Sequence, residues 1–182
     1  MAWHGSAHDR SQLACTSCHQ MHTAHDAVRD ETTQPEVCYT CHAQERADFQ
    51  KASTHPVRFG LMTCSGCHNA HGSSSTAMLV KASVNQTCYT CHAEKRGPFL
   101  WEHAPVTESC SNCHDPHGTN HEGMLKVTKP RLCQQCHIET RHPTRPYGLD
   151  TASKKFVLGQ SCTSCHVNIH GSNHPSGQTF TR

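Results

Sequence analysis

Apolar residues occur singly or in short clusters along the 182-residue chain, separated by polar residues, prolines and glycines. No stretch alternates between apolar and polar positions for long enough to predict a β-strand. No apolar run approaches the roughly 18 residues that a membrane span needs. The best helical patterns cover 43–51 and 93–101, and 72–76 and 118–123 indicate loops. The pattern therefore predicts few short α-helices, mostly loops, and little or no β-sheet.

The motif Cys-x-x-Cys-His occurs seven times and uses all 14 cysteines. It is typical of covalent c-type haem attachment, in which two thioethers hold the porphyrin and the His ligates the iron. We expect each motif to begin or occupy a short helical turn, and we predict seven covalently bound haem c groups. The predicted thioether residues are Cys15, Cys18, Cys38, Cys41, Cys64, Cys67, Cys88, Cys91, Cys110, Cys113, Cys133, Cys136, Cys162 and Cys165. The predicted proximal ligands are His19, His42, His68, His92, His114, His137 and His166.

The composition supports a core made largely of haem. Apolar residues make up 34% and aromatic residues 5% of the chain, below the usual apolar share of about 45–50%. Such a chain buries too little side-chain surface to fold alone, so we expect haem to provide the core and the haem-free chain to be unfolded. The formal charge of +2 excludes the haem propionates, so it does not indicate a nucleic-acid partner.

The seven motifs alternate between two kinds and form a repeat. From Cys15 to Cys133, alternate motifs are 45–50 residues apart, a period typical of repeat architectures. In one kind a second His follows the motif, as in Cys64–His71 and Cys110–His117; the other kind is plain. We predict one elongated multihaem domain over 1–182, with two-haem modules at about 4–53, 54–101 and 102–141. A single-haem tail at 142–182 completes it.

Histidines outside the motifs are the candidate distal ligands. One class lies upstream of the first motif of each module or of the tail, and the other lies three residues after a proximal His. The second class cannot ligate its own haem, because the two ligands must approach opposite porphyrin faces. We therefore expect these histidines to reach a neighbouring haem. The predicted distal ligands are His8, His22, His55, His71, His103, His117 and His142.

Two registers satisfy the count of distal ligands. In the first, which we favour, each upstream His ligates the haem that follows it and each CHxxH His ligates the next haem. In the second the register is shifted, and His170 replaces His8. His174 is a reserve candidate beside His170, and we expect His25 and His121 to be surface residues.

Zinc sites and disulfides would also use paired cysteines. Neither accounts for the His that follows the second cysteine of every pair. For function, the choice is between an electron carrier and a multihaem reductase with one open-site haem. No CxxCK motif marks an open-site haem, and the histidines can close every iron. We therefore predict an electron carrier and no enzyme activity.

Three long segments carry a family resemblance. Cys88-Tyr-Thr-Cys-His-Ala-Glu-Lys-Arg-Gly-Pro-Phe-Leu-Trp-Glu-His-Ala-Pro-Val106 leads into Cys110-Ser-Asn-Cys-His-Asp-Pro-His-Gly118. Leu132-Cys-Gln-Gln-Cys-His137 and Val167-Asn-Ile-His-Gly-Ser-Asn-His-Pro-Ser-Gly177 follow. Over essentially its whole length the chain resembles the periplasmic decahaem c-type cytochromes of the MtrA/DmsE type, and it matches their C-terminal seven-haem portion.

The resemblance implies bis-His haems in a staggered wire with little secondary structure. It also implies a location in the periplasm and insertion in an outer-membrane β-barrel porin. The implied partners are that porin, an extracellular multihaem cytochrome, and a periplasmic or inner-membrane quinol-linked cytochrome donor. The family carries ten haems and this chain has seven motifs, with no signal peptide visible at Met1-Ala2-Trp3. We therefore expect a short homologue, a processed form or a fragment.

Overall fold

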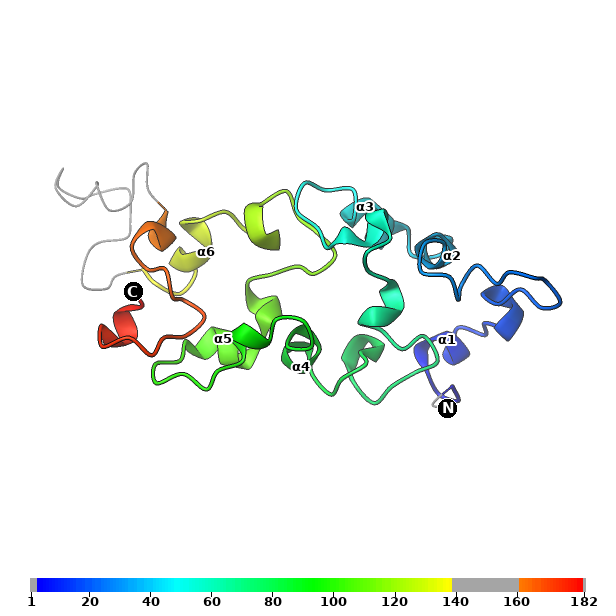
Figure 1. Ribbon diagram of the computed structural model, residues 1–182, viewed down its shortest axis with the longest axis horizontal. Coiled ribbons are helices and arrows are strands. Elements are labelled where there is room, and N and C mark those ends of the chain that lie inside the picture. The colour runs from blue at the N-terminus through cyan, green and yellow to red at the C-terminus, as the bar shows by residue number, and fades with distance from the viewer. Residues whose placement is uncertain (1–2, 139–160, 182) are drawn as a thin grey trace. The chain divides into compact units, whose positions relative to one another are not determined.

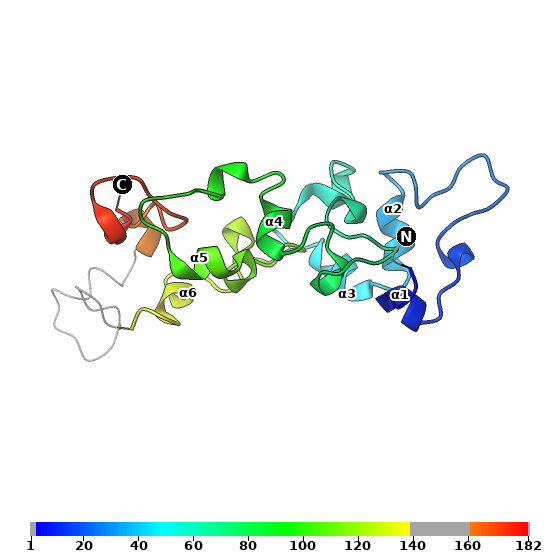
Figure 2. The same cartoon turned by 90° about the horizontal axis from the view of Figure 1, so that it is seen from below.

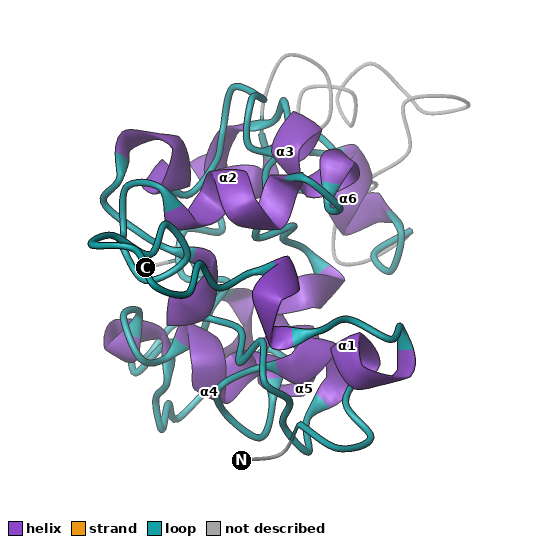
Figure 3. Cartoon of the chain, turned by 90° about the vertical axis from the view of Figure 1, so that its right-hand side faces the viewer, coloured by secondary structure: helices purple, strands orange, loops and turns teal. Residues whose placement is uncertain are grey.

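Short helices and long connections make up the described chain. The computed structural model describes residues 3–138 and 161–181, and no strand occurs among them (Figures 1 and 3). Few short helices, mostly loops and no sheet over these residues confirm the predicted fold class. No helix of the described part is long and apolar enough to cross a membrane. The α-helices are α1 (Ala7–Arg10), α2 (Gln34–Tyr39), α3 (Ala43–Asp48), α4 (Val84–Cys88), α5 (Ala104–Glu108) and α6 (Arg131–Gln134).

The haem motifs lie on two kinds of helical turn. Motifs of the CHxxH kind start 3₁₀ turns, whereas the first cysteines of plain motifs lie in the last turns of α2, α4 and α6. In both kinds the backbone N–H of the His donates to the carbonyl of the first Cys, as in His19 to Cys15 (2.8 Å) and His42 to Cys38 (3.0 Å). The motif is thus a closed turn, as expected. The 3₁₀ turns at the CHxxH motifs and at the tail motif are η1 (Cys15–Ser17), η3 (Cys64–Gly66), η6 (Cys110–Asn112) and η8 (Cys162–Ser164).

The two longer helices predicted from the pattern are shorter than expected. The helix expected over 43–51 is α3, which ends at Asp48. The helix expected over 93–101 is wrong beyond its first turn, since only η5 (Ala93–Lys95) forms. Gly97 follows at φ +76° and precedes Pro98, and a positive φ followed by proline cannot continue a helix. The remaining 3₁₀ turns are η2 (Pro56–Phe59), η4 (Thr76–Met78), η7 (Glu122–Met124) and η9 (Gly177–Thr179).

Side chains alone build only a small core. Among the described residues, the buried apolar side chains are Tyr39, Phe49 and Val57, with Met62 packed against them. No described side chain is fully buried. Large apolar side chains such as Leu61 and Leu100 are 76% exposed. The chain therefore presents apolar surface that its own residues do not cover.

The chain divides into two compact units: Met1–Cys91 with Asp115–Met124, and His92–His114 with Leu125–Arg182. Each unit contains a β-bridge between segments distant in sequence. In the first, Ser53 and Thr119 exchange backbone hydrogen bonds of 2.9 and 3.0 Å. In the second, Trp101 and Ser172 do the same, both at 2.9 Å. Figure 2 shows that loops, rather than helices, make up most of the described chain.

Removal of haem should unfold the protein, because three buried apolar side chains cannot offset the conformational entropy of the backbone. Chain expressed without haem attachment should show a far-ultraviolet circular dichroism spectrum of an unfolded polypeptide, with no cooperative thermal transition. The holoprotein is the control. A folded spectrum for the haem-free chain would show that side chains alone suffice.

Candidate functional site

Histidines from distant segments face one another in five pairs. Each pair joins a motif His to a His outside the motifs, with ring centroids 6.0–6.2 Å apart. A metal between two imidazoles, with bonds of about 2.0 Å to each nitrogen, requires a separation close to this. The pairs therefore fit bis-histidine haem. The pairs are His8–His42, His19–His71, His68–His117, His103–His137 and His114–His170.

The observed pairs correct the favoured register. That register assigned His8 to the haem that follows it, at His19. The structure instead places His8, on α1, 6.2 Å from the ring of His42. His19 faces His71, whose ring is 6.0 Å away and nearly parallel at 10°. The upstream His would thus ligate the haem of the second motif of its module, because His8, on α1, faces His42.

The structure differs from the expectations for His22, a predicted distal ligand, and for His170, which the favoured register left out. His22 is exposed, and its side chain has no hydrogen bond or ring contact among the described residues. His170, considered only in the second register, pairs with His114 at 6.1 Å. The reserve candidate His174 is exposed, and its Nδ1 accepts a hydrogen bond from the backbone of Ser176 (3.1 Å). Because the structure uses both His8 and His170, neither predicted register matches it.

The loop after each CHxxH motif completes the preceding module. His71 of the second module faces His19 of the first. The adjacent carbonyl of Ala70 accepts a hydrogen bond of 2.8 Å from Nδ1 of His8. This bond fixes the ring orientation and leaves Nε2 for the metal. With haem bound, one loop would thus supply a ligand to one iron and orient a ligand of another.

The same arrangement recurs along the chain. In the third module the carbonyl of Pro116 accepts from Nδ1 of His55 (2.8 Å), and the next residue, His117, faces His68. In the tail, the backbone of Ile169 lies near His103 and the next residue is His170, but the buried Nδ1 of His103 has no hydrogen-bond partner among the described residues. Burial is the main cause that lowers the pKa of His103, as suits a neutral ligand. By this equivalence we propose His55 as a distal ligand.

A glycine follows each distal His of this loop, and two of these glycines are sterically required. A Cβ on Gly118 (φ +142°) would lie 2.4 Å from the carbonyl oxygen of Asp48. A Cβ on Gly171 (φ +134°) would lie 2.2 Å from the ring of Phe99. The loop therefore packs closely against the segment that leads to an upstream His, since Asp48 precedes His55 and Phe99 precedes His103. His22 is followed by Thr23, which distinguishes it from the docked loops.

The Nδ1 atoms of the proximal histidines have different partners. His68 donates to the carbonyl of Ala77 (2.8 Å), and His166 donates to that of Thr179 (2.5 Å). His19 instead donates to the carboxylate of Asp26, at 2.7 Å. This hydrogen bond is the main cause that lowers the pKa of Asp26. The partner of a ligating imidazole tunes its metal, so the sites are not electronically equivalent.

Cysteines of successive motifs lie within electrostatic range of one another. The Sγ atoms of Cys38 and Cys64 share a hydrogen bond, which is the main cause that raises the pKa of Cys38. Burial, followed by the charge of Cys162, raises the pKa of Cys133 to about 11. Thioethers do not titrate, but these contacts show that attachment points of neighbouring haems are close. The other such pairs are Cys18 with Cys38 and Cys41, Cys67 with Cys91, and Cys113 with Cys136.

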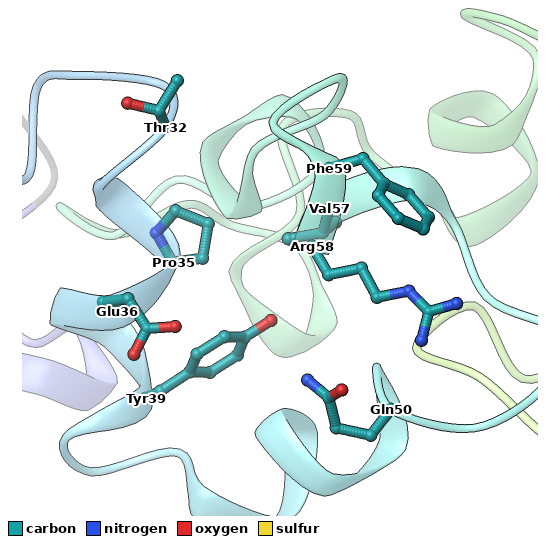
Figure 4. Close-up of a pocket in the computed structure, with 8 residues that line it drawn as sticks. All are labelled: Thr32, Pro35, Glu36, Tyr39, Gln50, Val57, Arg58 and Phe59. Atoms are coloured by element: carbon teal, nitrogen blue, oxygen red, sulfur yellow. The ribbon is translucent and has the colours of Figure 1, made fainter.

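A cavity of about 440 Å³ opens between α2 and η2 (Figure 4). The hydroxyl of Tyr39 is buried and has no hydrogen-bond partner among the described residues. Burial is the main cause that raises its pKa to about 12, so it stays a donor at neutral pH. Gln50 and Arg58 add donors to the lining, and Glu36 adds a carboxylate.

The remaining candidate histidines have the following places. His25 is exposed and lies 3.9 Å from a carboxylate oxygen of Asp30. His121 is half-buried. His142, predicted as a distal ligand, lies outside the described residues. Among the described residues, no three His, Cys, Asp or Glu side chains are grouped to hold a zinc ion.

Comparison with known proteins shows similarity to a family and to a longer relative. The family described as "Doubled CXXCH motif" matches residues 4–47, 55–97 and 103–142, each with two motifs. The chain is 50% identical over 188 aligned positions to "Multiheme cytochrome MtrA" of Shewanella baltica (strain OS185). The match covers all of this chain and 56% of the relative, so the chain spans little more than half of the relative's length.

Replacing His8 and His22 separately tests the pairing. His8→Ala should convert one haem per molecule to a high-spin form, because His42 loses its partner. His22→Ala should leave every haem low-spin, because His22 has no contact among the described residues. Electron paramagnetic resonance of the oxidised proteins measures both. A high-spin haem in the His22 variant would restore the favoured register.

Substituting Gly118 tests the docked loop. Gly118→Ala should destabilise the protein by about 1–3 kcal/mol, because its Cβ overlaps Asp48 and Thr54. It should also loosen His117 and increase the high-spin signal. Gly123→Ala is the matched control, with positive φ (+67°) and nothing within 4 Å of its Cβ. Equal losses in thermal denaturation for both variants would show that backbone strain, not docking, is responsible.

Proposed function

Because the chain belongs to the doubled-CXXCH family of multihaem cytochromes and is an MtrA-type cytochrome by similarity, we propose that it conducts electrons along seven bis-His c-type haems. Each haem is attached through one of the seven CXXCH motifs. The protein's part is to fix the haem spacing, the ligands and the dielectric around each haem. Oxidation and reduction of the iron are the chemistry that the haem supplies.

The main support for this proposal is the proximity of Cys38 and Cys64. These residues belong to successive motifs, and Cys64 is the main cause that raises the pKa of Cys38, so the two side chains lie close together. Since each sulfur would be bonded to the edge of its own porphyrin, this proximity supports two haems close enough for direct electron transfer. The proximity of Cys133 to Cys162 repeats this relation in the second unit.

The paired histidines favour an electron carrier over a reductase. An iron with two imidazole ligands has no position for substrate, and its ligand set need not rearrange when the iron changes oxidation state. A reductase requires at least one open iron with acid and base groups beside it. Each of the five described pairs closes an iron site. The reductase with one open-site haem remains the alternative function.

Partners and location follow from the resemblance to the MtrA type. We propose a periplasmic protein that inserts in an outer-membrane β-barrel porin. Electrons would pass between a periplasmic or quinol-linked cytochrome donor and an extracellular multihaem cytochrome. The relative is longer than this chain, so the length of membrane that these haems span is part of the proposal.

Voltammetry of the adsorbed holoprotein tests the function. Seven haems per molecule, measured as pyridine haemochrome, should give a reversible signal equal to seven electrons. Nitrite, sulfite or hydroxylamine should produce no catalytic current. A catalytic wave together with a high-spin haem in the untreated protein would instead establish the reductase. Fewer than seven electrons would show a gap in the wire.

A further inference from the structure

Asp26 is held against one proximal histidine by a closed loop. Its Oδ2 accepts a hydrogen bond of 2.7 Å from Nδ1 of His19, and its Oδ1 accepts one of 3.2 Å from the backbone N–H of Gln20. Thr23 closes the loop by donating to the carbonyl of His25 (2.7 Å). The side chain of Asp26 is 18% exposed, so water screens its charge only partly.

The carboxylates beside two other proximal histidines lie farther from the ring. Glu45 lies 3.7 Å from Nδ1 of His42 and Glu94 lies 3.8 Å from Nδ1 of His92, beyond hydrogen-bond distance. Both glutamates are also more exposed than Asp26. His68 and His166 donate to backbone carbonyls instead.

A carboxylate on Nδ1 changes the metal ligand. The hydrogen bond draws the proton away from the ring, so the imidazole gains imidazolate character and donates more electron density through Nε2. Greater donation, together with the negative charge nearby, stabilises ferric iron relative to ferrous iron. Hydrogen bonding around the axial ligand is one of the means by which a protein sets a haem potential.

We propose that Asp26 is a positioning residue that gives the haem of Cys15–His19 the most negative reduction potential in the chain. The inference rests on the proposed function, because it requires haem at this motif. It adds an order among the reduction potentials of the haems. Cys18 of this motif lies near Cys38 and Cys41 of the next, so an electron on this haem passes downhill to its neighbour.

Potentiometric titration of the holoprotein tests the proposal, with electron paramagnetic resonance as the readout. Asp26→Asn should shift the most negative reduction step to less negative potential, since the amide keeps an acceptor but loses the charge. Asp26→Glu should restore a negative step. Glu45→Gln and Glu94→Gln are matched controls and should leave that step in place. An unchanged step in Asp26→Asn, or equal shifts in the controls, would overturn the proposal.

A second variant probes the same haem from its other face. His71 faces His19, so His71→Met should replace an imidazole with a thioether and raise the most negative step. If that step is unaffected, the lowest potential belongs to another haem and the assignment fails. The number of haems, measured as pyridine haemochrome, distinguishes a failure of the proposed function from a failure of the role given to Asp26. Fewer than seven haems in the unmodified protein contradicts the proposed function, whereas seven haems with an unmoved step contradict only the role of Asp26.

Discussion

Bis-histidine haem, as proposed for this chain, imposes one requirement, that each iron receives an imidazole from both faces of its porphyrin. A motif can supply only one face, so the second imidazole must come from elsewhere in the sequence. The pairs His19–His71 and His68–His117 span about a whole repeat. These ligand pairs take the place that a side-chain core has in an ordinary domain, since only Tyr39, Phe49 and Val57 form the buried apolar core of the described residues. Metal–ligand bonds thereby become folding contacts.

The requirement explains what could be predicted from the sequence. The motif spacing predicted the loop-rich fold and the two alternating motif kinds, because these depend on local chemistry. His71 and His117 each face a motif His other than their own, in line with the exclusion of CHxxH pairs from a single iron. Which neighbour each distal His reaches was wrong for His8, because direction along a repeat is set by packing and not by spacing. A glycine follows His71, His117 and His170, whereas Thr23 follows His22. This difference in the sequence could have distinguished the docked loops from the loop of His22.

The environment of the ligands could not be predicted from the motifs. The carbonyls of Ala70 and Pro116 orient His8 and His55 across more than 60 residues of sequence. The carboxylate of Asp26 reaches His19 from only seven residues away, but nothing in a CxxCH motif indicates it. Differences among chemically identical haem sites therefore arise outside the motifs, in the turns that follow them.

The loop that completes the preceding module also bears on how such a chain is made and how it can change in length. A module would receive its last ligands from the segment that follows it, so closure of one module requires the next. The described modules share this relation, as in other nearest-neighbour repeat proteins. Duplication or loss of a whole internal module would therefore leave every remaining pair intact. Chain length in this architecture can evolve in steps of two haems without redesign of any site.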